Sequence, residues 1–419
     1  MSMEEWKEYK IEEIISEISM GPFGSDVKKE VYTLFGVPIL NGANLQGFKL
    51  KEDSFGYVSE EKANSLKKCN AHRGDVVVTH RGTLGQIVYI PDNSKFDRYV
   101  ISQSQFRFTC NNDIVRPDFL VCLFHTKEGQ HKILSNASQV GVPALARATT
   151  TFRQIKVKIP SLNVQNRIMN ILSPLDDKIE VNRRINEQLE ELAQALFKSW
   201  FVDFEPFKDS EFVESELGMI PKGWKVCELS EIGDIVGGAT PSKANPDYYT
   251  EKGISWITPK DLSINKNKFI DKGETDITEL GYSKCSAKLM PKGTVLFSSR
   301  APIGYIAIAK KELCTNQGFK SIVPKVAGTA FIYFYLKNNV SNIESMASGS
   351  TFKEASGSLM KSLKVIVPPN DLLQKFEEKV SSIFDKQEAL EEEITHLTAL
   401  RDTLLPKLMS GEIDVTTNL

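Results

Sequence analysis

The side chains that could support metal or covalent chemistry are few and scattered along this chain. Two Cys-x2-His pairs, Cys69 with His72 and Cys122 with His125, have the spacing of metal ligands. Neither has a second pair at a matching distance, so the sequence favours ordinary buried or loop residues. The chain contains no Gly-x-Gly-x-x-Gly loop, no Gly-x4-Gly-Lys-Ser/Thr phosphate loop and no Ser/His/Asp arrangement. We therefore predict no bound metal and no bound cofactor.

One tetrapeptide, at residues 245–248, reads Asn-Pro-Asp-Tyr. It resembles the Asn-Pro-Pro-aromatic motif of enzymes that methylate amino groups, but it lacks the second proline. Asparagine and proline are also typical turn residues, and we interpret this segment as a turn. The residue types that could take part in catalysis therefore predict a protein without a catalytic centre of its own.

Basic side chains gather in two short stretches. Residues 143–160 carry four cations and no acid, and residues 62–81 carry five cations against Asp75 alone. Such stretches can neutralise phosphates, and Arg, Lys, Gln or Asn on loops can contact base edges. A solvated lysine face is the alternative for about half of them. The predicted DNA-contacting residues are Lys67, Lys68, Arg81, Gln103, Arg147, Arg153, Lys243, Lys260, Arg300, Gln317 and Lys353.

Two of these cations, Arg81 and Arg300, recur at matching places in a repeated pattern. Gly74-Asp75-Val-Val-Val before Arg81 matches Gly293-Thr-Val-Leu-Phe before Arg300, 219 residues later, and Gln103 matches Gln317. Trp6-Lys7 matches Trp224-Lys225, and Ile155-Lys-Val before Pro160 matches Leu363-Lys-Val before Pro368. Residues that both copies share should not read DNA sequence, because the two copies would then read the same sequence. We therefore expect Arg81 and Arg300 to position phosphates or to form internal salt bridges, with base reading where the copies diverge.

Long helices must position these loops. Apolar residues recur at steps of three and four from Ile168 to Leu196 and again from Leu373 to Leu404, which is the pattern of a heptad seam. The first stretch would be ~55 Å long at ~1.5 Å per residue. Asn182 and Gln387 lie in the seams, where burial would fix the helix register; exposure at a splayed stretch is the alternative. Large apolar residues end the first helix, and Phe197, Trp200 and Phe201 are predicted either to bind a partner or to pack against the second globular part.

The rest of each copy predicts a mixed α/β domain. Short helices are expected at residues 11–18 and 229–235, and longer ones at 119–134 and 330–346. Strand pairs are expected at 76–79 with 86–90 and at 294–298 with 305–309. The resulting fold class is α/β, with two globular domains on two antiparallel coiled-coil helices and an internal pseudo-two-fold repeat. The predicted boundaries are 1–161, a long helix at 162–204, a linker at 205–222, 223–369, a second helix at 370–409 and a frayed tail at 410–419.

Short connections would place the two globular parts at opposite ends of a helical rod. The net charge of −2 and the hydrophobic content of 41% are typical of a soluble globular protein, and no apolar run approaches the ~20 residues of a membrane span. Six scattered cysteines and an N-terminus without an apolar signal sequence predict a cytoplasmic location.

The helix text LDDKIEVNRRINEQLEELAQALFKSWFVDFEPF, at 175–207, resembles the central conserved region of the specificity subunits of type I restriction–modification systems. LLPKLMSGEIDV, at 404–415, resembles their C-terminal conserved region. The resemblance implies two target-recognition domains that read the halves of a bipartite double-stranded DNA site, and a helical rod that sets their spacing. It also implies partner modification subunits, two in number, that carry S-adenosylmethionine and the adenine N6-methylation chemistry, and restriction subunits that carry ATP-driven translocation and cleavage. The chain itself would be non-catalytic and would need no self-association.

Two other functions remain open from the residues alone. A self-contained DNA methyltransferase or nuclease would bind S-adenosylmethionine or a nucleotide. A coiled-coil adaptor without a nucleic-acid role would bind no DNA.

Overall fold

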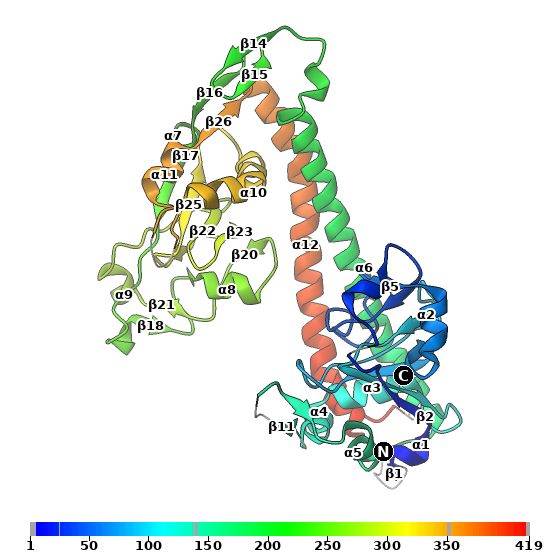
Figure 1. Ribbon diagram of the computed structural model, residues 1–419. Coiled ribbons are helices and arrows are strands. Elements are labelled where there is room, and N and C mark those ends of the chain that lie inside the picture. The colour runs from blue at the N-terminus through cyan, green and yellow to red at the C-terminus, as the bar shows by residue number, and fades with distance from the viewer. Residues whose placement is uncertain (1–5, 25, 136, 139–140, 350–352, 416–419) are drawn as a thin grey trace. The chain divides into compact units, whose positions relative to one another are not determined.

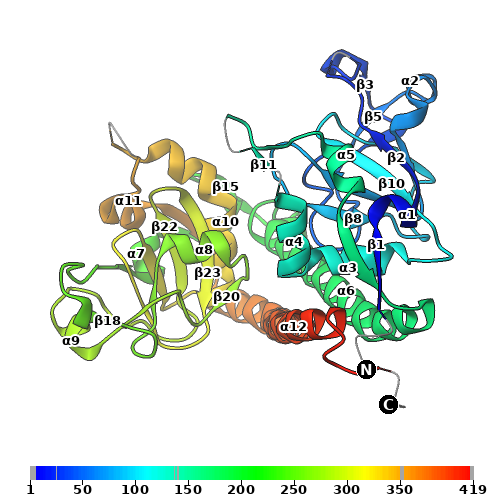
Figure 2. The ribbon, with the colours of Figure 1, turned by 90° about the horizontal axis from the view of Figure 1, so that it is seen from below.

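The computed structural model describes residues 6–24, 26–135, 137–138, 141–349 and 353–415 of the 419-residue chain. The chain divides into two compact units (Figure 1 and Figure 2). The first unit comprises residues 1–178 and 396–419, and the second comprises residues 179–395. Each contains mixed α/β structure, which confirms the predicted fold class. Among the described residues, no helix is both long and apolar enough to cross a membrane.

The first unit is built on two sheets. Its core sheet is antiparallel, with the order β2 (Ile15–Met20), β10 (Gln105–Cys110), β7 (Asp75–Thr79) and β8 (Ile87–Tyr89). The second sheet has the order β3 (Tyr32–Thr33), β5 (Gly56–Val58), β4 (Val37–Ile39), β9 (Arg98–Val100) and β6 (Asn70–His72). All five residues of β7 are buried. A strand covered on both faces requires a continuous apolar run, and the three consecutive valines of β7 supply it.

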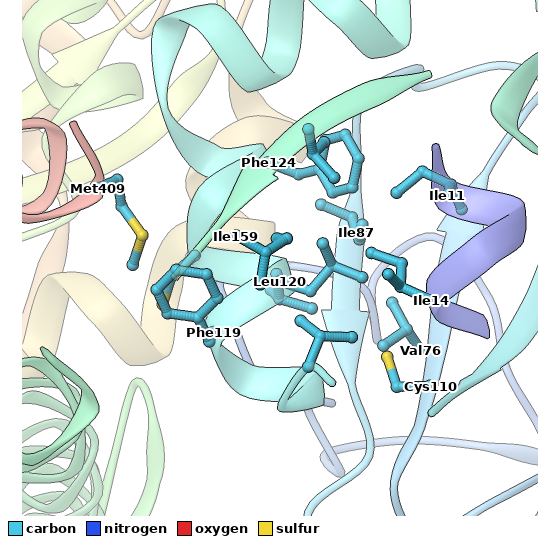
Figure 3. Packing of buried hydrophobic residues seen from close by; sticks show 14 of the residues in the cluster. Ile11, Ile14, Val76, Ile87, Cys110, Phe119, Leu120, Phe124, Ile159 and Met409 are labelled. Carbon is cyan, nitrogen blue, oxygen red and sulfur yellow. The ribbon is translucent and has the colours of Figure 1, made fainter. Parts of the chain in front are cut away.

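Helix α3 (Pro117–His125) packs against β7 and β8. Its residues Phe119, Leu120 and Phe124 lie in the core of the first unit with Val76 and Ile87 from the sheet (Figure 3). Smaller elements complete this unit: β1 (Lys7–Lys10), α1 (Ile11–Ile14), α2 (Glu60–Ser65), α4 (Lys127–Leu134), β11 (Ala137–Ser138), β12 (Ala144–Leu145), α5 (Ala148–Arg153) and β13 (Lys156–Ile159).

Three sequence predictions about helices need correction. The predicted helix at 119–134 is two helices, because Thr126 is extended and its hydroxyl accepts a hydrogen bond from the Gly129 N–H at 3.0 Å, which caps α4. The helices predicted at 11–18 and 229–235 are single turns, α1 and α7 (Leu229–Ile232). From Ile15 and Gly233 onwards the backbone pairs with a neighbouring strand instead, so tertiary pairing overrides the helical spacing of the isoleucines.

The second unit repeats this architecture, as the sequence predicts. Its core sheet has the order β17 (Gly233–Gly237), β25 (Lys320–Pro324), β22 (Val295–Ser299), β23 (Ile303–Ala309) and β20 (Phe269–Ile270). The same antiparallel pairing closes each globular part, between β1 and β13 in the first unit and between β16 (Lys225–Glu228) and β26 (Lys364–Val367) in the second. The other elements are β18 (Tyr249–Thr250), β19 (Trp256–Ile257), α8 (Pro259–Ile264), β21 (Asp276–Ile277), α9 (Glu279–Ser283), β24 (Cys314–Thr315), α10 (Thr329–Met346) and α11 (Gly357–Ser362).

Two helices of 40 residues each, α6 (Leu162–Phe201) and α12 (Asn370–Met409), run antiparallel. In the first unit, residue 176 of α6 forms an ion pair with residue 401 of α12. In the second unit, residues 186 and 201 of α6 contact residues 391 and 376 of α12. The partner number on α12 falls as the number on α6 rises, which confirms the predicted antiparallel arrangement. Both polar seam residues, Asn182 and Gln387, are buried, at 0% and 1% exposure.

A buried cation joins the helices to the globular part of the second unit. Lys268, which directly precedes β20, is 6% exposed and forms an ion pair with Glu190 of α6. Its ammonium donates a hydrogen bond to Gln387 of α12 and lies 4.1 Å from the ring centre of Phe384. Its backbone N–H donates to Glu391 at 2.8 Å. One side chain therefore contacts both helices at the level of the polar seam residue.

Electrostatics at this cluster follow from burial and pairing. Burial lowers the pKa of Lys268 from 10.5 to about 8, against the opposing attraction of Glu190. Burial alone would raise the pKa of Glu190, but the ion pairs with Lys268 and Lys337 outweigh it and lower that pKa below its usual value. At neutral pH the pair is therefore charged.

Two segments are more ordered than the sequence predicts. Residues 212–221, within the predicted linker, form a hairpin of β14 (Phe212–Ser215) and β15 (Gly218–Pro221). Residues 410–415, predicted as a frayed tail, pack on the first unit: Val415 is 5% exposed, and its carbonyl accepts a hydrogen bond from Arg167 at 2.9 Å. Residues 416–419 of that predicted tail lie outside the described residues.

Candidate nucleic-acid interface

Equivalent loops carry the repeated Arg and Gln residues in both units. Arg81 follows β7 and Arg300 follows the equivalent strand β22. Gln103 follows β9, which runs parallel to β4, and Gln317 follows β24, which runs parallel to β19. Because parallel strands end at the same edge, the loops after β4 and β9, and after β19 and β24, emerge together. Both glutamines are exposed.

In the second unit these loops surround a cleft of about 830 Å³. Four of the five residues predicted for this unit line it: Lys243, Lys260, Arg300 and Gln317. They come from three loops and helix α8, up to 74 residues apart in the chain, so the fold brings them together. A cleft with three cations and an amide can hold phosphate oxygens and offer hydrogen bonds to bases.

Acidic neighbours moderate the charge of this cleft. The Lys260 ammonium lies 2.5 Å from a Glu274 carboxylate oxygen, and an Arg300 guanidinium nitrogen lies 3.8 Å from Glu354. Lys243 forms no ion pair with any described residue. Lys353, the fifth predicted residue, is exposed but does not line the cleft; it directly precedes Glu354. The structure therefore groups four of these five residues.

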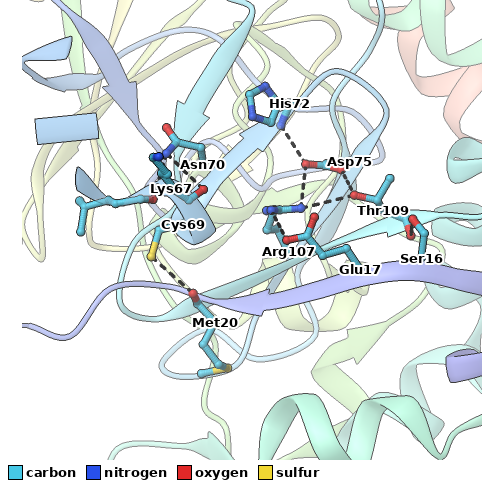
Figure 4. A network of polar contacts seen from close by, with 11 residues as sticks. Ser16, Glu17, Met20, Lys67, Cys69, Asn70, His72, Asp75, Arg107 and Thr109 are labelled. Carbon is cyan, nitrogen blue, oxygen red and sulfur yellow. Dashed lines mark hydrogen bonds and ion pairs between the residues drawn. The ribbon is translucent and has the colours of Figure 1, made fainter. Parts of the chain in front are cut away.

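The first unit has a smaller cleft, of about 470 Å³, lined by Lys68 from one loop and Arg153 from the end of α5. The turn that carries Lys67 and Lys68 is held from beneath. Asn70, which lies beside Lys67 in Figure 4, donates hydrogen bonds from its side-chain amide to the carbonyls of Ala63 at 2.8 Å and Leu66 at 2.9 Å. Both lysines are exposed, so their ammonium groups project from a fixed backbone.

A buried network fixes the strands beneath this cleft. Arg107 of β10 contacts Glu17 of β2 at 2.7 Å and Asp75 of β7 at 3.5 Å (Figure 4). Burial raises the pKa of Asp75, although the Thr109 hydroxyl and the His72 N–H donate to it. The end of β2 is thereby tied to its neighbours, and Met20 at that end lines the cleft.

The other predicted residues of the first unit continue from this cleft along one surface. Arg153 and Arg147 stand at the two ends of α5, and Arg147 adopts the left-handed φ of 48° that a non-glycine residue rarely takes. Arg81 forms an isolated bridge with Ala144, close before Arg147. Between Arg81 and Gln103, the His80 ring nitrogen lies 3.2 Å from the Gln103 carbonyl oxygen. The structure thus connects the six predicted residues of this unit.

The five cations of this surface, which we call the first-unit basic surface, share one property. None of them forms an ion pair with another described residue; they are Lys67, Lys68, Arg81, Arg147 and Arg153. All five are exposed. Arg81 therefore has no internal salt bridge among the described residues, whereas Arg300 does have one with Glu354. Cations without acidic partners remain available for phosphate groups.

The predicted partner-binding residues divide into two kinds. Phe197 and Phe201 are 3% and 5% exposed and pack in the core of the second unit against Phe331 and Phe376. They therefore take the packing role that the sequence left as the alternative. Trp200 is half-buried, with its ring centre 6.2 Å from that of Phe376. Only its outer part is accessible for a partner.

The metal-like and turn-like motifs have ordinary structural roles. The Cys69 thiol lies 3.6 Å from the Met20 carbonyl, and His125 contacts the Ile87 carbonyl at 2.9 Å. No group of three or more His, Cys, Asp or Glu side chains gathers as a metal site in the described part of the chain. Asn245 accepts a hydrogen bond from the Asp247 N–H at 3.1 Å, which confirms the turn.

Sequence reasoning missed several residues that belong to these surfaces. Thr240 and Asn316 line the cleft of the second unit, and the Thr240 hydroxyl donates to the Gln317 side chain. In the first unit, Gly24 contacts the side chain of Gln103. The repeat offset of 217 residues would have aligned Phe23 with Thr240. The sequence alignment of the two repeats therefore contained this equivalence, but the two residues are of different types and the match was not recognised.

Comparisons with known proteins assign the chain to a family. A family described as "Type I restriction modification DNA specificity domain" matches residues 3–191 and 221–398. The type I restriction enzyme HindI specificity subunit of Haemophilus influenzae is 27% identical over 98% of this chain and 100% of its own. The MjaIX specificity subunit of Methanocaldococcus jannaschii is 42% identical over 42% of this chain and 41% of its own.

A solved structure supports the fold independently. The crystal structure of a type I restriction–modification S subunit from M. genitalium matches with a TM-score of 0.60 and 19% identity, over 96% of each chain. The two family matches together cover most of the chain, and each includes one globular part and most of the long helix that follows it. This protein therefore belongs to the type I restriction–modification DNA specificity family.

Proposed function

We propose that this chain reads a bipartite DNA site, with each unit reading one half, and that it does so as the non-catalytic specificity subunit of a type I restriction–modification complex. The observation that carries this proposal is the pair of equivalent loop platforms. Each has an arginine and a glutamine at matching positions, and the side chains around them differ. Shared residues suit the DNA backbone, which is uniform, and divergent neighbours suit two unlike half-sites.

The two long helices support a fixed spacing between the half-sites. Each helix is continuous for 40 residues, and each contributes residues to both units. A reader with both units on shared helices would tolerate little change in the gap between its half-sites. The domain boundaries that the sequence predicts, with recognition domains at 1–161 and 223–369, belong to this proposal.

The first prediction concerns that gap. Inserting about 5 base pairs, half a helical turn, between the half-sites should lower the affinity of the complete complex about a hundredfold, because one half-site then faces away from its reader. Electrophoretic mobility shift with the chain and its modification subunits measures this, on a target first mapped from methylated adenines in a host with and without the gene. A duplex with the same insertion outside the site is the control. Unchanged binding would remove the fixed-spacing proposal.

Partner binding is the second part of the proposal. We propose that modification subunits, two in number, dock on the helices and supply the S-adenosylmethionine-dependent chemistry, and that restriction subunits join this assembly. The accessible part of Trp200, at the end of α6, is the proposed contact.

The second prediction tests this contact. Trp200→Ala should weaken binding of the modification subunit about tenfold while the chain stays folded, because Trp residues dominate many interfaces and this ring is only half-buried. Size-exclusion chromatography with purified subunits measures the complex. Phe197→Ala is the contrasting variant, since Phe197 is 3% exposed and its loss should unfold the second unit instead. A folded W200A chain that binds as the wild type does would exclude the contact.

A self-contained methyltransferase is the alternative, and calorimetry of the isolated chain with S-adenosylmethionine separates the two. We expect no binding heat from the chain alone and binding once a modification subunit is added.

A further inference from the structure

Phe23 is an exposed aromatic residue that directly precedes Gly24, which packs against the repeated glutamine of the first unit. It is 83% exposed, which is unusual for a phenylalanine. Its backbone is nevertheless held: its N–H donates to the Asp26 carboxylate at 3.2 Å, and its carbonyl accepts from the Asp26 N–H at 2.9 Å. The ring therefore projects into solvent from a hydrogen-bonded turn.

The segment around Phe23 lies on the Gln103 loop. A Cβ atom added to Gly21 would stand 1.9 Å from the Ser102 carbonyl oxygen, and one added to Gly24 would stand 2.4 Å from the Gln103 side-chain oxygen. Glycine is needed at position 21 because the two backbones approach so closely, whereas at position 24 the close atom is the end of the Gln103 side chain, which can move. Met20, three residues before Phe23, lines the cleft that also contains Lys68 and Arg153. Phe23 thus stands between Gln103 and the first-unit basic surface.

The strand registers identify the equivalent of Phe23 in the second unit. Ser19 of β2 pairs with Arg107 of β10, and Val236 of β17 pairs with Ser321 of β25. These are equivalent strands in equivalent sheets, so Ser19 corresponds to Val236. Four residues after each of them, Phe23 corresponds to Thr240.

The backbone just before Thr240 approaches the glutamine loop of the second unit as the backbone just before Phe23 approaches that of the first. Gly238 packs on the Asn316 carbonyl as Gly21 packs on that of Ser102, and the Thr240 hydroxyl donates to Gln317. Thr240 lines the cleft of the second unit with Arg300 and Gln317. The same position on the same platform therefore carries a hydroxyl in one unit and an aromatic ring in the other, and the fold requires neither.

We propose that Phe23 is a specificity-determining residue of the first unit, which contacts a base of the first half-site through its apolar ring. This rests on the proposed function. Double-stranded DNA is the occupant that the surroundings favour, because the segment that carries Phe23 runs from the cleft with the unpaired Lys68 and Arg153 to the exposed Gln103. Apolar side chains discriminate bases through the thymine methyl group or through the face of a partly unstacked base.

The test uses the complete complex of chain and modification subunits on the mapped target. Every base pair of both half-sites is substituted in turn, and binding is measured by mobility shift. In Phe23→Ala we expect about tenfold less discrimination at one or two adjacent positions of the first half-site. Discrimination at the second half-site, and affinity for random duplex, should stay as in the wild type. Phe23→Leu should retain part of the effect, since it keeps an apolar contact.

Phe35→Ala is the matched control. Phe35 is 82% exposed, and it lies in the turn between β3 and β4. Lys252 occupies the corresponding place in the second unit, between β18 and the pairing of Ile254 with Ile277. We expect F35A to leave discrimination at both half-sites unchanged. An equal loss in both variants would overturn the proposal, because exposure alone would then explain it.

Two further outcomes have definite meanings. If F23A keeps full discrimination, or weakens binding of the modification subunit without DNA, Phe23 is not a base contact and the inference fails alone. If the wild-type complex shows no discrimination at either half-site, the proposed function fails, and this inference fails with it.

Discussion

Replacing Lys268 with alanine is expected to destabilise the second unit by about 3 kcal/mol, the low end of the range for breaking a buried ion pair, because Glu190 loses one of its two cationic partners. Glu190, whose side chain is 19% exposed, would lose this ion pair and keep only Lys337. Gln387 would lose the donor to its side-chain oxygen. Urea unfolding of the full chain, followed by tryptophan fluorescence, measures the loss. Three of the four tryptophans, at positions 200, 224 and 256, lie in the second unit.

The matched control is Lys375→Ala. Lys375 forms an ion pair with Asp371, four residues earlier on α12, at 3.5 Å, but both side chains are more than 60% exposed. An exposed pair of this kind contributes less than about 1 kcal/mol. Lys268→Met separates charge from packing: it keeps most of the apolar stem beside Phe384 and still leaves Glu190 without this partner. If K268A and K375A lose similar stability, the buried cluster does not hold the globular part on the helices.

In the first unit, a similar contact between a cation and an aromatic ring joins the globular part to α12. The ring and the cation, however, come from the opposite elements. Lys49 bridges to Tyr89 in parallel, as Phe269 pairs with Ile308 in the second unit, so Phe48-Lys49 and Lys268-Phe269 occupy equivalent places. In the first unit the aromatic ring comes from the globular part, and the Arg401 guanidinium of α12 lies 4.9 Å from the centre of the Phe48 ring. In the second unit the cation comes from the globular part and the ring of Phe384 from α12.

This exchange explains why sequence comparison could not find the equivalence. Residues 47–70 and 263–290 show no similarity, and at the one contact that both units retain, the aromatic residue and the cation have changed sides. The long helices, in contrast, could be predicted from the sequence, and their antiparallel direction followed from the short connections between the repeated parts. Their apolar residues recur over many turns, and that signal depends on burial along one face and on little else.

Short elements depended on partners that are distant in the chain. Ile11, Ile14, Ile15 and Ile18 have the spacing of a helix face, but only the first two lie in one, because Ile15 and Ile18 pair with β10. Likewise the chain end around Val415 is ordered by burial in a core made largely of residues before position 180. Neither pairing is encoded in the local sequence.

The sequence predicted which residue types would form the candidate site and, in part, which loops would carry them. Repetition of Arg81 as Arg300 and of Gln103 as Gln317 marked the loops correctly as a related pair of platforms. What could not be predicted is the grouping of Lys243, Lys260, Arg300 and Gln317 around one cleft, since it depends on how three loops and helix α8 fold over the strands. The difference between Arg81, without an acidic partner, and Arg300, paired with Glu354, also emerges only from the structure.

A triple substitution on the first-unit basic surface is expected to weaken DNA binding whatever the DNA sequence. Lys68→Ala, Arg147→Ala and Arg153→Ala together should lower affinity about a hundredfold near physiological salt, equally for the target and for random duplex. The physical reason is counterion release: each phosphate that the protein no longer neutralises removes about 0.9 from the slope of log K against log salt concentration. The slope should therefore fall by about 2.7 in filter-binding titrations of the full complex.

The control triple is Arg184→Ala, Lys222→Ala and Lys375→Ala, which removes the same total charge. Each of these cations is exposed and pairs with a nearby acid: Glu180 at 3.2 Å, Glu211 at 2.7 Å and Asp371 at 3.5 Å. Its salt slope should match that of the wild type, since only net charge has changed. An equal fall in both triples would mean that overall charge attracts the duplex, and the unpaired cations around α5 would then have no special role. A fall only in the first triple, with base discrimination intact, would assign that surface to the DNA backbone and leave sequence reading to the residues where the two units differ.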